Sequence, residues 1–120
     1  MPWIEVARVD DIVPSGRLTV GLASADVVVW RTASGVLSAA DARCPHQWAH
    51  LGATGLVDGE VLVCPSHGWC FDPDGTGFKR SATGRRDEKS PLTRGPVRER
   101  EGAIEVDVDE GVVHTEVHRP

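Results

Sequence analysis

Two short segments of the sequence each combine a cysteine with a histidine. Cys44 and His46 are separated by one residue and Cys64 and His67 by two, and seventeen residues lie between the segments. Thiolate sulfur and imidazole nitrogen are the protein ligands of zinc sites and of some iron–sulfur clusters. A third cysteine, Cys70, makes the number odd, so the cysteines cannot all pair within one chain. Metal binding is therefore the first chemistry that the sequence predicts.

Two kinds of metal site use two cysteines and two histidines. A structural zinc site usually spaces its ligands as Cys-x₂₋₄-Cys and His-x₃₋₅-His, whereas here each segment contains one of each residue type. Two thiolates on one iron and two imidazoles on the other form the ligand set of a Rieske [2Fe–2S] centre. The spacing favours this centre, and a Cys₂His₂ zinc site is the alternative.

The residues around these segments resemble the signature of the Rieske family. A proline follows each of the two cysteines, Gly68-Trp69 follows the second histidine, and Phe71-Asp72 is similar to an aromatic-Asp step in many members. The resemblance covers most of the chain. It implies one [2Fe–2S] cluster per chain, and no catalytic residues. The implied ligands are Cys44, His46, Cys64 and His67.

The sequence also departs from the respiratory branch of that family. The positions that match its two disulfide cysteines are Ala49 and Ser66, and the positions that match its Ser and Tyr hydroxyls are Trp69 and Phe71. Fewer hydrogen bonds to the cluster sulfur leave the reduced state less stabilised. We therefore expect a reduction potential near the low end of the Rieske range, about −150 mV.

Several other residues have chemistry that the cluster does not require. Cys70 is expected to be a small buried apolar residue rather than a ligand, and His50 a packing or solvent-facing residue. Trp48 and Trp69 are expected to shield the cluster. A metal site at His114 and His118 is not expected, because the valines around them indicate a strand. A basic stretch is either a solvated loop or a docking surface for an acidic redox partner, and it contains Lys79, Arg80, Arg85, Arg86 and Lys89.

The elements that must position these residues are short strands. Gly and Pro recur along the whole chain, which is typical of strands joined by turns. Asp58-Gly59 between apolar runs predicts a hairpin that brings the two Cys/His segments together. The cluster-binding loops are expected at about residues 43–55 and 64–77, and residues 81–90 as a surface loop. Strands are expected at residues 3–9, 17–22, 26–31, 36–40, 56–57, 61–63, 97–101, 103–107 and 112–117. The predicted fold is one all-β domain over residues 1–120, an antiparallel sandwich or small barrel with the two loops as a cluster-binding subdomain.

Composition restricts the remaining function classes. The 120 residues include 13 basic and 18 acidic side chains, for a formal charge of −5. A nucleic-acid-binding face is therefore not expected. No apolar run approaches the roughly 20 residues of a membrane span, and residues 1–5 lack the features of a signal peptide. The expected location is the cytoplasm.

The resemblance implies an electron carrier rather than an enzyme. It is most similar to Rieske-type ferredoxins, which take an electron from a flavin-dependent reductase and give it to a terminal oxygenase. The alternatives are a Rieske domain or small subunit of a larger oxygenase, or of a nitrite-reductase-type enzyme. An oxygenase acting alone would need a mononuclear iron held by two histidines and a carboxylate, and no such set is recognisable in the sequence.

Overall fold

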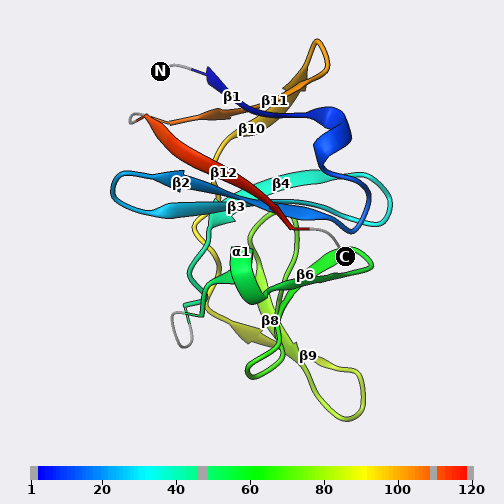
Figure 1. Cartoon of the computed structure of the whole chain (residues 1–120). Helices are drawn as coiled ribbons and strands as arrows, with labels where there is room; N and C mark the ends of the chain where they lie inside the picture. The colour runs from blue at the N-terminus through cyan, green and yellow to red at the C-terminus, as the bar shows by residue number, and fades with distance from the viewer. Residues whose placement is uncertain (1–2, 46–48, 109–110, 119–120) are drawn as a thin grey trace.

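The computed structural model describes residues 3–45, 49–108 and 111–118, which form three antiparallel sheets. Figure 1 shows the sheets one below another, with β12 at the edge of the middle one and a short helix, α1, beneath it. A 3-10 turn, η1, spans Val9–Asp11. The strands are β1 (Trp3–Arg8), β2 (Arg17–Leu22), β3 (Asp26–Arg31), β4 (Leu37–Asp41), β5 (Leu56–Asp58), β6 (Val61–Cys64), β7 (Trp69–Phe71), β8 (Gly77–Arg80), β9 (Arg86–Lys89), β10 (Val97–Arg100), β11 (Ala103–Asp107) and β12 (Val112–His118). The predicted all-β fold is confirmed.

The middle sheet, in the order β12-β2-β3-β4, separates two hydrophobic cores. Side chains alternate between the faces of a strand, and β3 follows this rule. Val28 and Trp30 lie in the core that also contains Cys44 and Cys64, whereas Val29 lies in the other core. The continuous apolar run at residues 27–30 thus reflects a strand that is buried on both faces.

The upper sheet, in the order β1-β11-β10, covers one face of the middle sheet. Ile104 and Val106 of β11 pack with Leu18 and Val20 of β2 in the second core. The pairing of β1 with β11 changes register between Glu5 and Ala7, as at a β-bulge. This sheet contributes none of the predicted ligands.

The lower sheet, in the order β5-β6-β7-β8-β9, contains the second Cys/His segment. The predicted hairpin around Asp58-Gly59 is confirmed, because β5 pairs with β6 and Asp58 lies opposite Val61. The loop predicted at residues 81–90 is wrong in its second half, where Arg86–Lys89 forms β9 and pairs with β8. The alternation of apolar and polar residues that marks a half-buried strand is missing there, because the side chains of β9 are all charged.

The two predicted cluster-binding loops also contain regular structure. The first includes α1 (Leu51–Thr54), and the second includes β7 and the start of β8. These elements have only three or four residues each, which is too short for a periodic pattern to reveal them. No helix in the described ranges is long and apolar enough to cross a membrane.

Candidate metal centre

Cys44 lies in a tight loop that leaves the middle sheet after β4. The Cys44 N–H donates to the Ala49 carbonyl at 2.9 Å, and the Leu51 N–H donates to the Ala42 carbonyl at 2.6 Å. These bonds close a small loop between Cys44 and Ala49. His46 and Trp48 fall within that loop in sequence and lie outside the described residues.

The helix α1 anchors this loop to the middle sheet. The Arg17 guanidinium donates to the carbonyls of Gly52 and Ala53, at 3.0 and 3.2 Å. A Cβ atom at Gly52 would overlap the Thr19 hydroxyl of β2, so a glycine is needed for this close approach. The loop that carries Cys44 therefore has a fixed position relative to β2.

Cys64 ends β6, and a tight turn then leads to β7. The Gly68 N–H donates to the Cys64 carbonyl at 2.9 Å, and Cys64 lies opposite Trp69 in the sheet. Gly68 has φ = +73° with open space around its Cα, so the backbone conformation alone favours glycine here. The turn leaves His67 exposed at the surface.

The structure brings the two cysteine thiols into one hydrophobic core. Cys44 is 0% exposed and Cys64 is 3% exposed, and both pack in a cluster with Leu51, Leu62 and Phe71. Soft thiolate donors in an apolar interior, with an imidazole at the adjacent surface, suit an iron–sulfur cluster. These three residues therefore fit the predicted ligand set. Within the described ranges no three His, Cys, Asp or Glu side chains are gathered as a metal site, and the fourth predicted ligand, His46, lies outside those ranges.

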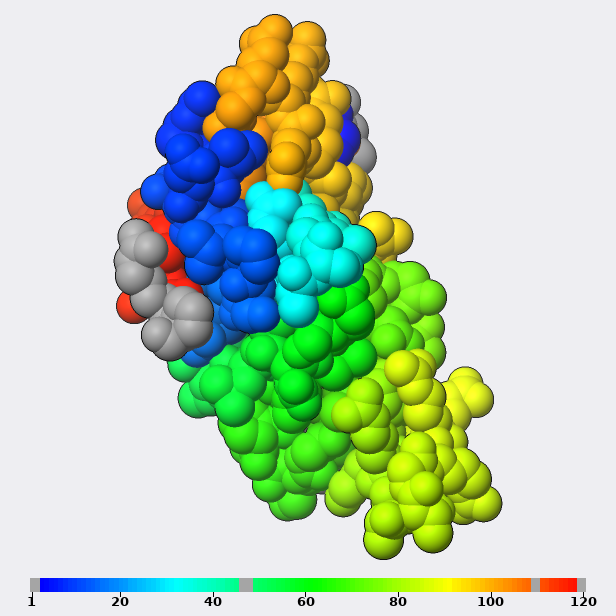
Figure 2. All heavy atoms as spheres, turned by 90° about the vertical axis from the view of Figure 1, so that its right-hand side faces the viewer, coloured from blue at the N-terminus to red at the C-terminus, as the bar shows by residue number. Residues whose placement is uncertain are grey.

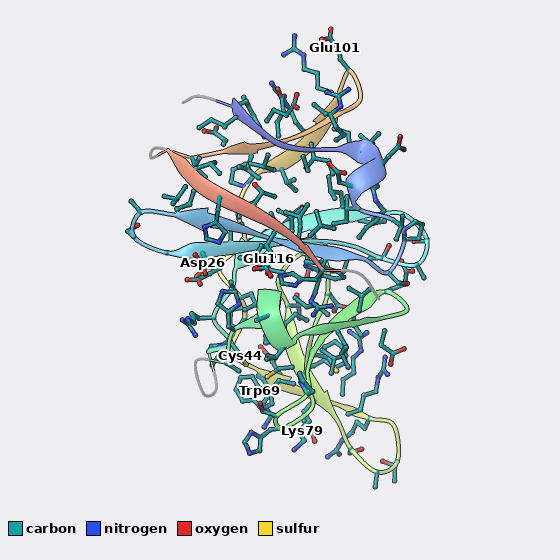
Figure 3. All side chains as sticks on the ribbon, viewed as in Figure 1. Asp26, Cys44, Trp69, Lys79, Glu101 and Glu116 are labelled. Atoms are coloured by element: carbon teal, nitrogen blue, oxygen red, sulfur yellow. The ribbon has the colours of Figure 1, made fainter. Side chains whose placement is uncertain are left out.

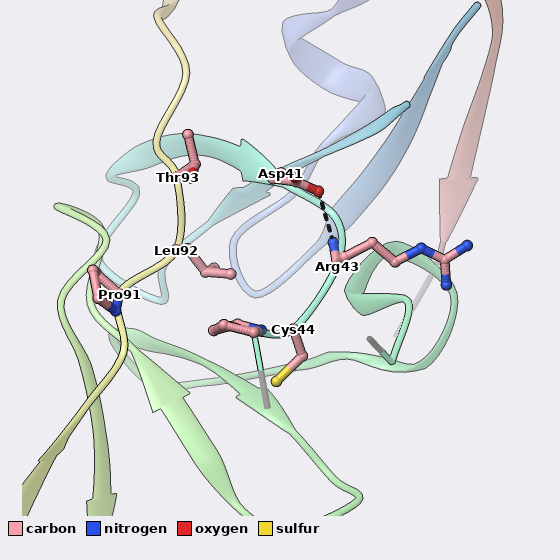
Figure 4. Close-up of a pocket in the computed structure, with 7 residues that line it drawn as sticks. Asp41, Arg43, Cys44, Pro91, Leu92 and Thr93 are labelled. Carbon is pink, nitrogen blue, oxygen red and sulfur yellow. Dashed lines mark hydrogen bonds between the residues drawn. The ribbon is translucent and has the colours of Figure 1, made fainter. Parts of the chain in front are cut away.

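A third segment, residues 91–95, covers the loop of Cys44, and no spacing in the sequence predicted it. Its Leu92 is buried in the same cluster as the two thiols. The Leu92 N–H donates to the Gly75 carbonyl at 2.9 Å, and the Thr93 carbonyl accepts from the Asp41 N–H at 2.9 Å. A cavity of about 230 Å³ lies between this segment and Cys44, and Figure 4 shows the residues that line it. Two prolines, Pro91 and Pro96, were the only local signal of an ordered connection.

His50 has a structural role. Its Nδ1 accepts from the Ala53 N–H at 3.0 Å and so caps α1, which places the ring proton on Nε2. Nε2 donates to the Asp26 carboxylate at 2.7 Å. Both ring nitrogens are engaged in these hydrogen bonds, which agrees with the prediction that His50 is a packing or solvent-facing residue rather than a ligand.

The two C-terminal histidines lie on β12, in the middle sheet. His114 packs over Gly21 of β2, and His118 Nε2 lies 2.9 Å from the Thr19 hydroxyl. Partial burial lowers the pKa of His118, and the positive charge of Arg17 lowers it further. The strand predicted around these histidines is confirmed.

Cys70 lies on the opposite face of β7 from Trp69 and Phe71. It is buried in a separate small cluster with Val61 and Phe78, and its thiol donates to the Gly68 carbonyl at 3.4 Å. Burial raises the pKa of this thiol, and the nearby Arg80 partly offsets that effect. The expectation of a small buried residue is confirmed.

Trp69 is half-buried at the edge of the core that holds the two thiols. In Figure 3 its side chain lies in the same part of the molecule as Cys44, at the end opposite to Glu101. Its indole therefore separates part of this core from water. A shielding role predicted for Trp69 requires this position.

Comparisons with known proteins give one family. A model of the Rieske [2Fe-2S] domain matches residues 2–99. The oxidoreductase NdmD of Pseudomonas putida is 31% identical over 106 residues, which cover 85% of this chain and 18% of the relative. Cholesterol 7-desaturase nvd of Hemicentrotus pulcherrimus is 34% identical over 70 residues, which cover 58% of this chain and 15% of the relative. The chain thus spans less than a fifth of the length of these two relatives.

Solved structures of two oxygenase systems share the fold. Apo dicamba monooxygenase superposes with a TM-score of 0.74 and 26% identity, over 88% of this chain and 32% of that one. A chain from the complex of reduced oxygenase and oxidized ferredoxin in carbazole 1,9a-dioxygenase gives 0.70 and 28%, over 87% of this chain and 100% of that one. The match of fold, sequence and buried thiols leads to one conclusion: the chain belongs to the Rieske [2Fe-2S] domain family, the electron-transfer modules that bind a [2Fe–2S] cluster.

Proposed function

We propose that this chain is a low-potential, one-electron carrier that passes electrons from a reductase to a terminal oxygenase. Its [2Fe–2S] cluster would be held by Cys44, His46, Cys64 and His67. The observation that carries the proposal is the contrast between two thiols buried in one apolar core and an exposed His67 at the turn beside it. The bound cluster supplies the capacity to accept and release one electron.

The interior and the surface of the protein would have different roles in electron transfer. The core around Cys44 and Cys64 excludes water from the sulfur ligands, and Leu92 closes that core from the third segment. The exposed imidazole of His67 would hold the cluster near the surface and would offer the partner a short path for the electron. No side chain is required as a general acid or base, because only an electron is transferred.

Two apolar neighbours of Cys64 support a low potential. Phe71 is 0% exposed in the core of the two thiols, and Trp69 packs at its edge. Neither side chain has a hydroxyl group, so neither supplies the O–H donor that would stabilise the additional negative charge of the reduced cluster. We therefore place the midpoint potential near −150 mV, about the lower end of the Rieske range.

Two roles within oxygenase systems agree with this chemistry. The carbazole dioxygenase structure, whose matching chain is covered in full, supports a separate ferredoxin. The larger relatives, of which the chain spans 15% and 18%, support a Rieske domain of a larger enzyme. A small subunit of an oxygenase or of a nitrite-reductase-type enzyme is the related alternative. We favour the ferredoxin role, and the two can be separated by kinetics.

The first test concerns the cluster itself. We expect about two irons and two acid-labile sulfides per chain, and a rhombic electron paramagnetic resonance signal in the reduced protein. One zinc per chain without acid-labile sulfide would overturn the proposal.

The second test concerns electron transfer. In anaerobic stopped-flow experiments, a flavin-dependent reductase with NADH should reduce the cluster, and a terminal oxygenase with its substrate should reoxidise it. A separate carrier should raise oxygenase turnover saturably as its concentration rises. Reduction without any effect on the turnover of oxygenases would favour the role of a domain in a larger enzyme.

A further inference from the structure

The hairpin of β8 and β9 is the positively charged part of an acidic protein. Residues 79–89 contain five of the 13 basic residues and two of the 18 acidic residues. This hairpin has a formal charge of +3, and the remainder of the chain has −8. Figure 2 shows the hairpin as a yellow-green projection at one end of the molecule. Charge of opposite sign to the rest of the surface is therefore concentrated in one exposed element.

The strand register assigns these charges to two faces. Residues directly opposite each other in an antiparallel pair share a face, and the pairs Lys79↔Asp87 and Gly77↔Lys89 alternate with Arg80↔Arg86. Because Gly77 also lies opposite Phe71, the lysines share the face of Phe71 and Trp69. Arg80 and Arg86 share the opposite face, with Phe78.

The two arginines on the opposite face are engaged within the protein. Arg86 lies 3.8 Å from the centroid of the Phe78 ring, and it donates to the Asp72 carboxylate at 2.9 Å. Arg80 lies 5.7 Å from the same ring. These contacts cover the small cluster around Cys70, so their role is structural.

The two lysines lie next to the route that electrons would take. Lys89 Nζ is 5.8 Å from the centroid of the Trp69 ring, and Trp69 packs against the core of the two thiols. Lys79 is exposed, and Figure 3 places it near Trp69 at the same end of the molecule. The one carboxylate on this face of the hairpin, Asp87, forms an ion pair with Arg85 at 3.3 Å. Among the described residues, no carboxylate is within ion-pair distance of Lys79 or Lys89.

We propose that the face of the hairpin marked by Lys79 and Lys89 is a docking surface for a redox protein with an acidic surface around its own redox centre. This proposal rests on the proposed role as an electron carrier. Long-range attraction between opposite charges raises the rate of encounter and orients the partner. The positive charges beside Trp69 would turn the buried thiol core and the exposed His67 toward such a partner, while the acidic remainder of the surface would repel it.

The experiment compares charge reversals at three positions in the holoprotein, of which Lys79 and Arg100 are exposed and Lys89 is half-buried. Lys79→Glu and Lys89→Glu alter the proposed surface, and Arg100→Glu makes the same change on β10, in the sheet that contributes no predicted ligand. Each dithionite-reduced protein is oxidised in a stopped-flow instrument by one of three probes. These are the ferricyanide anion, the hexaamminecobalt(III) cation and cytochrome b5, a small acidic haem protein. Midpoint potentials and melting temperatures are measured for every variant, so that rates can be compared at equal driving force.

We expect Lys79→Glu and Lys89→Glu to lower the second-order rate constants with ferricyanide and cytochrome b5 by about tenfold at low ionic strength, and to raise the rate with the cobalt complex. The differences should shrink in 0.5 M salt, and Arg100→Glu should have a much smaller effect. Equal effects of all three substitutions, or rates that do not depend on salt, would overturn the docking surface. A protein that discriminates between these probes but exchanges no electrons with a reductase or an oxygenase would instead contradict the proposed function.

Discussion

At the scale of single residues, the three buried cysteines differ in what surrounds them. Cys44 and Cys64 share one core, and Cys64 precedes the turn of His67, whereas Cys70 lies on the other side of the lower sheet with Phe78. All three carry buried thiols, so burial alone does not identify a ligand. The core in which each thiol is buried does distinguish them.

We therefore predict that Cys44→Ser and Cys64→Ser abolish cluster assembly and that Cys70→Ser retains it. A serine hydroxyl is a poor replacement for a thiolate on a soft iron–sulfur unit. Iron and acid-labile sulfide analysis with visible absorption measures the outcome. Cys70→Ser serves as the matched control, and loss of the cluster in this variant at an unchanged melting temperature would contradict the ligand assignment.

A second prediction concerns Phe71, the aromatic residue buried in the core of the two thiols. Phe71→Tyr adds a hydroxyl in the core of the two thiols, and a hydrogen bond to the cluster would stabilise its reduced state. A net gain of about 1 kcal/mol corresponds to a rise of roughly 40 mV in a one-electron midpoint potential. Protein-film voltammetry measures this shift.

The control for this variant is Phe78→Tyr, which adds the same hydroxyl on the opposite face of the sheet. Its potential should stay within the error of the wild-type value. Equal shifts in both variants would show that the missing hydroxyl at Phe71 does not set the potential.

At the scale of elements, three segments from distant parts of the sequence close on the thiol core. The loop after β4, the end of β6 and residues 91–95 each contribute a buried side chain, namely Cys44, Cys64 and Leu92. The third segment is fastened by backbone hydrogen bonds to Gly75 and Asp41, on either side of the core. It acts as a cover over the loop of Cys44.

Leu92→Ala should therefore lower the free energy of unfolding by about 2–5 kcal/mol, as expected for a truncated buried leucine. It should also speed the loss of the cluster to an iron chelator, because the cavity beside Cys44 would open. Urea unfolding and the decay of visible absorption measure the two effects. The control, Leu56→Ala, truncates a leucine that is 55% exposed and should change stability by only about 0.5 kcal/mol. Similar chelation rates in the two variants would contradict the covering role.

The sequence predicted elements well where the apolar pattern was strong. The bounds predicted for the strands at residues 17–22 and 26–31 agree with β2 and β3, and the Asp58-Gly59 hairpin was predicted correctly. The charged strand β9 was missed because contacts such as Arg86 on Phe78 hold it, and these depend on a neighbouring strand. Leu92 was missed for the same reason, since its place beside Cys44 is a contact across 48 residues of sequence that no local spacing reveals.

At the scale of the whole molecule, the C-terminal strand β12 is an edge strand fastened to β2. His118 contributes to this attachment through the 2.9 Å contact of its Nε2 with the Thr19 hydroxyl. Burial, followed by the charge of Arg17, lowers the pKa of His118, and Glu116 opposes this effect. The folded protein therefore favours the neutral imidazole more than the unfolded chain does.

The sign of the resulting pH dependence follows from linkage. Below the ordinary histidine pKa of about 6.5, the unfolded chain binds the proton more readily than the folded protein. The stability due to neutral His118 is thus present above that pH and is lost as the pH falls below it. Urea unfolding midpoints of the wild type and His118→Gln should differ most at pH 8 and converge toward pH 5. A difference that stays constant over this range would contradict the prediction.

The strand β3 contributes side chains to both hydrophobic cores, with Val28 and Trp30 on one face and Val29 on the other. The part of the molecule that holds the thiols and the part that does not therefore share one strand. As the separate carrier that we propose, the protein would release one partner, diffuse and meet the next, so the lifetime of each complex would set an upper limit on electron flux. Weak, salt-sensitive and short-lived association is the form of binding that suits this architecture.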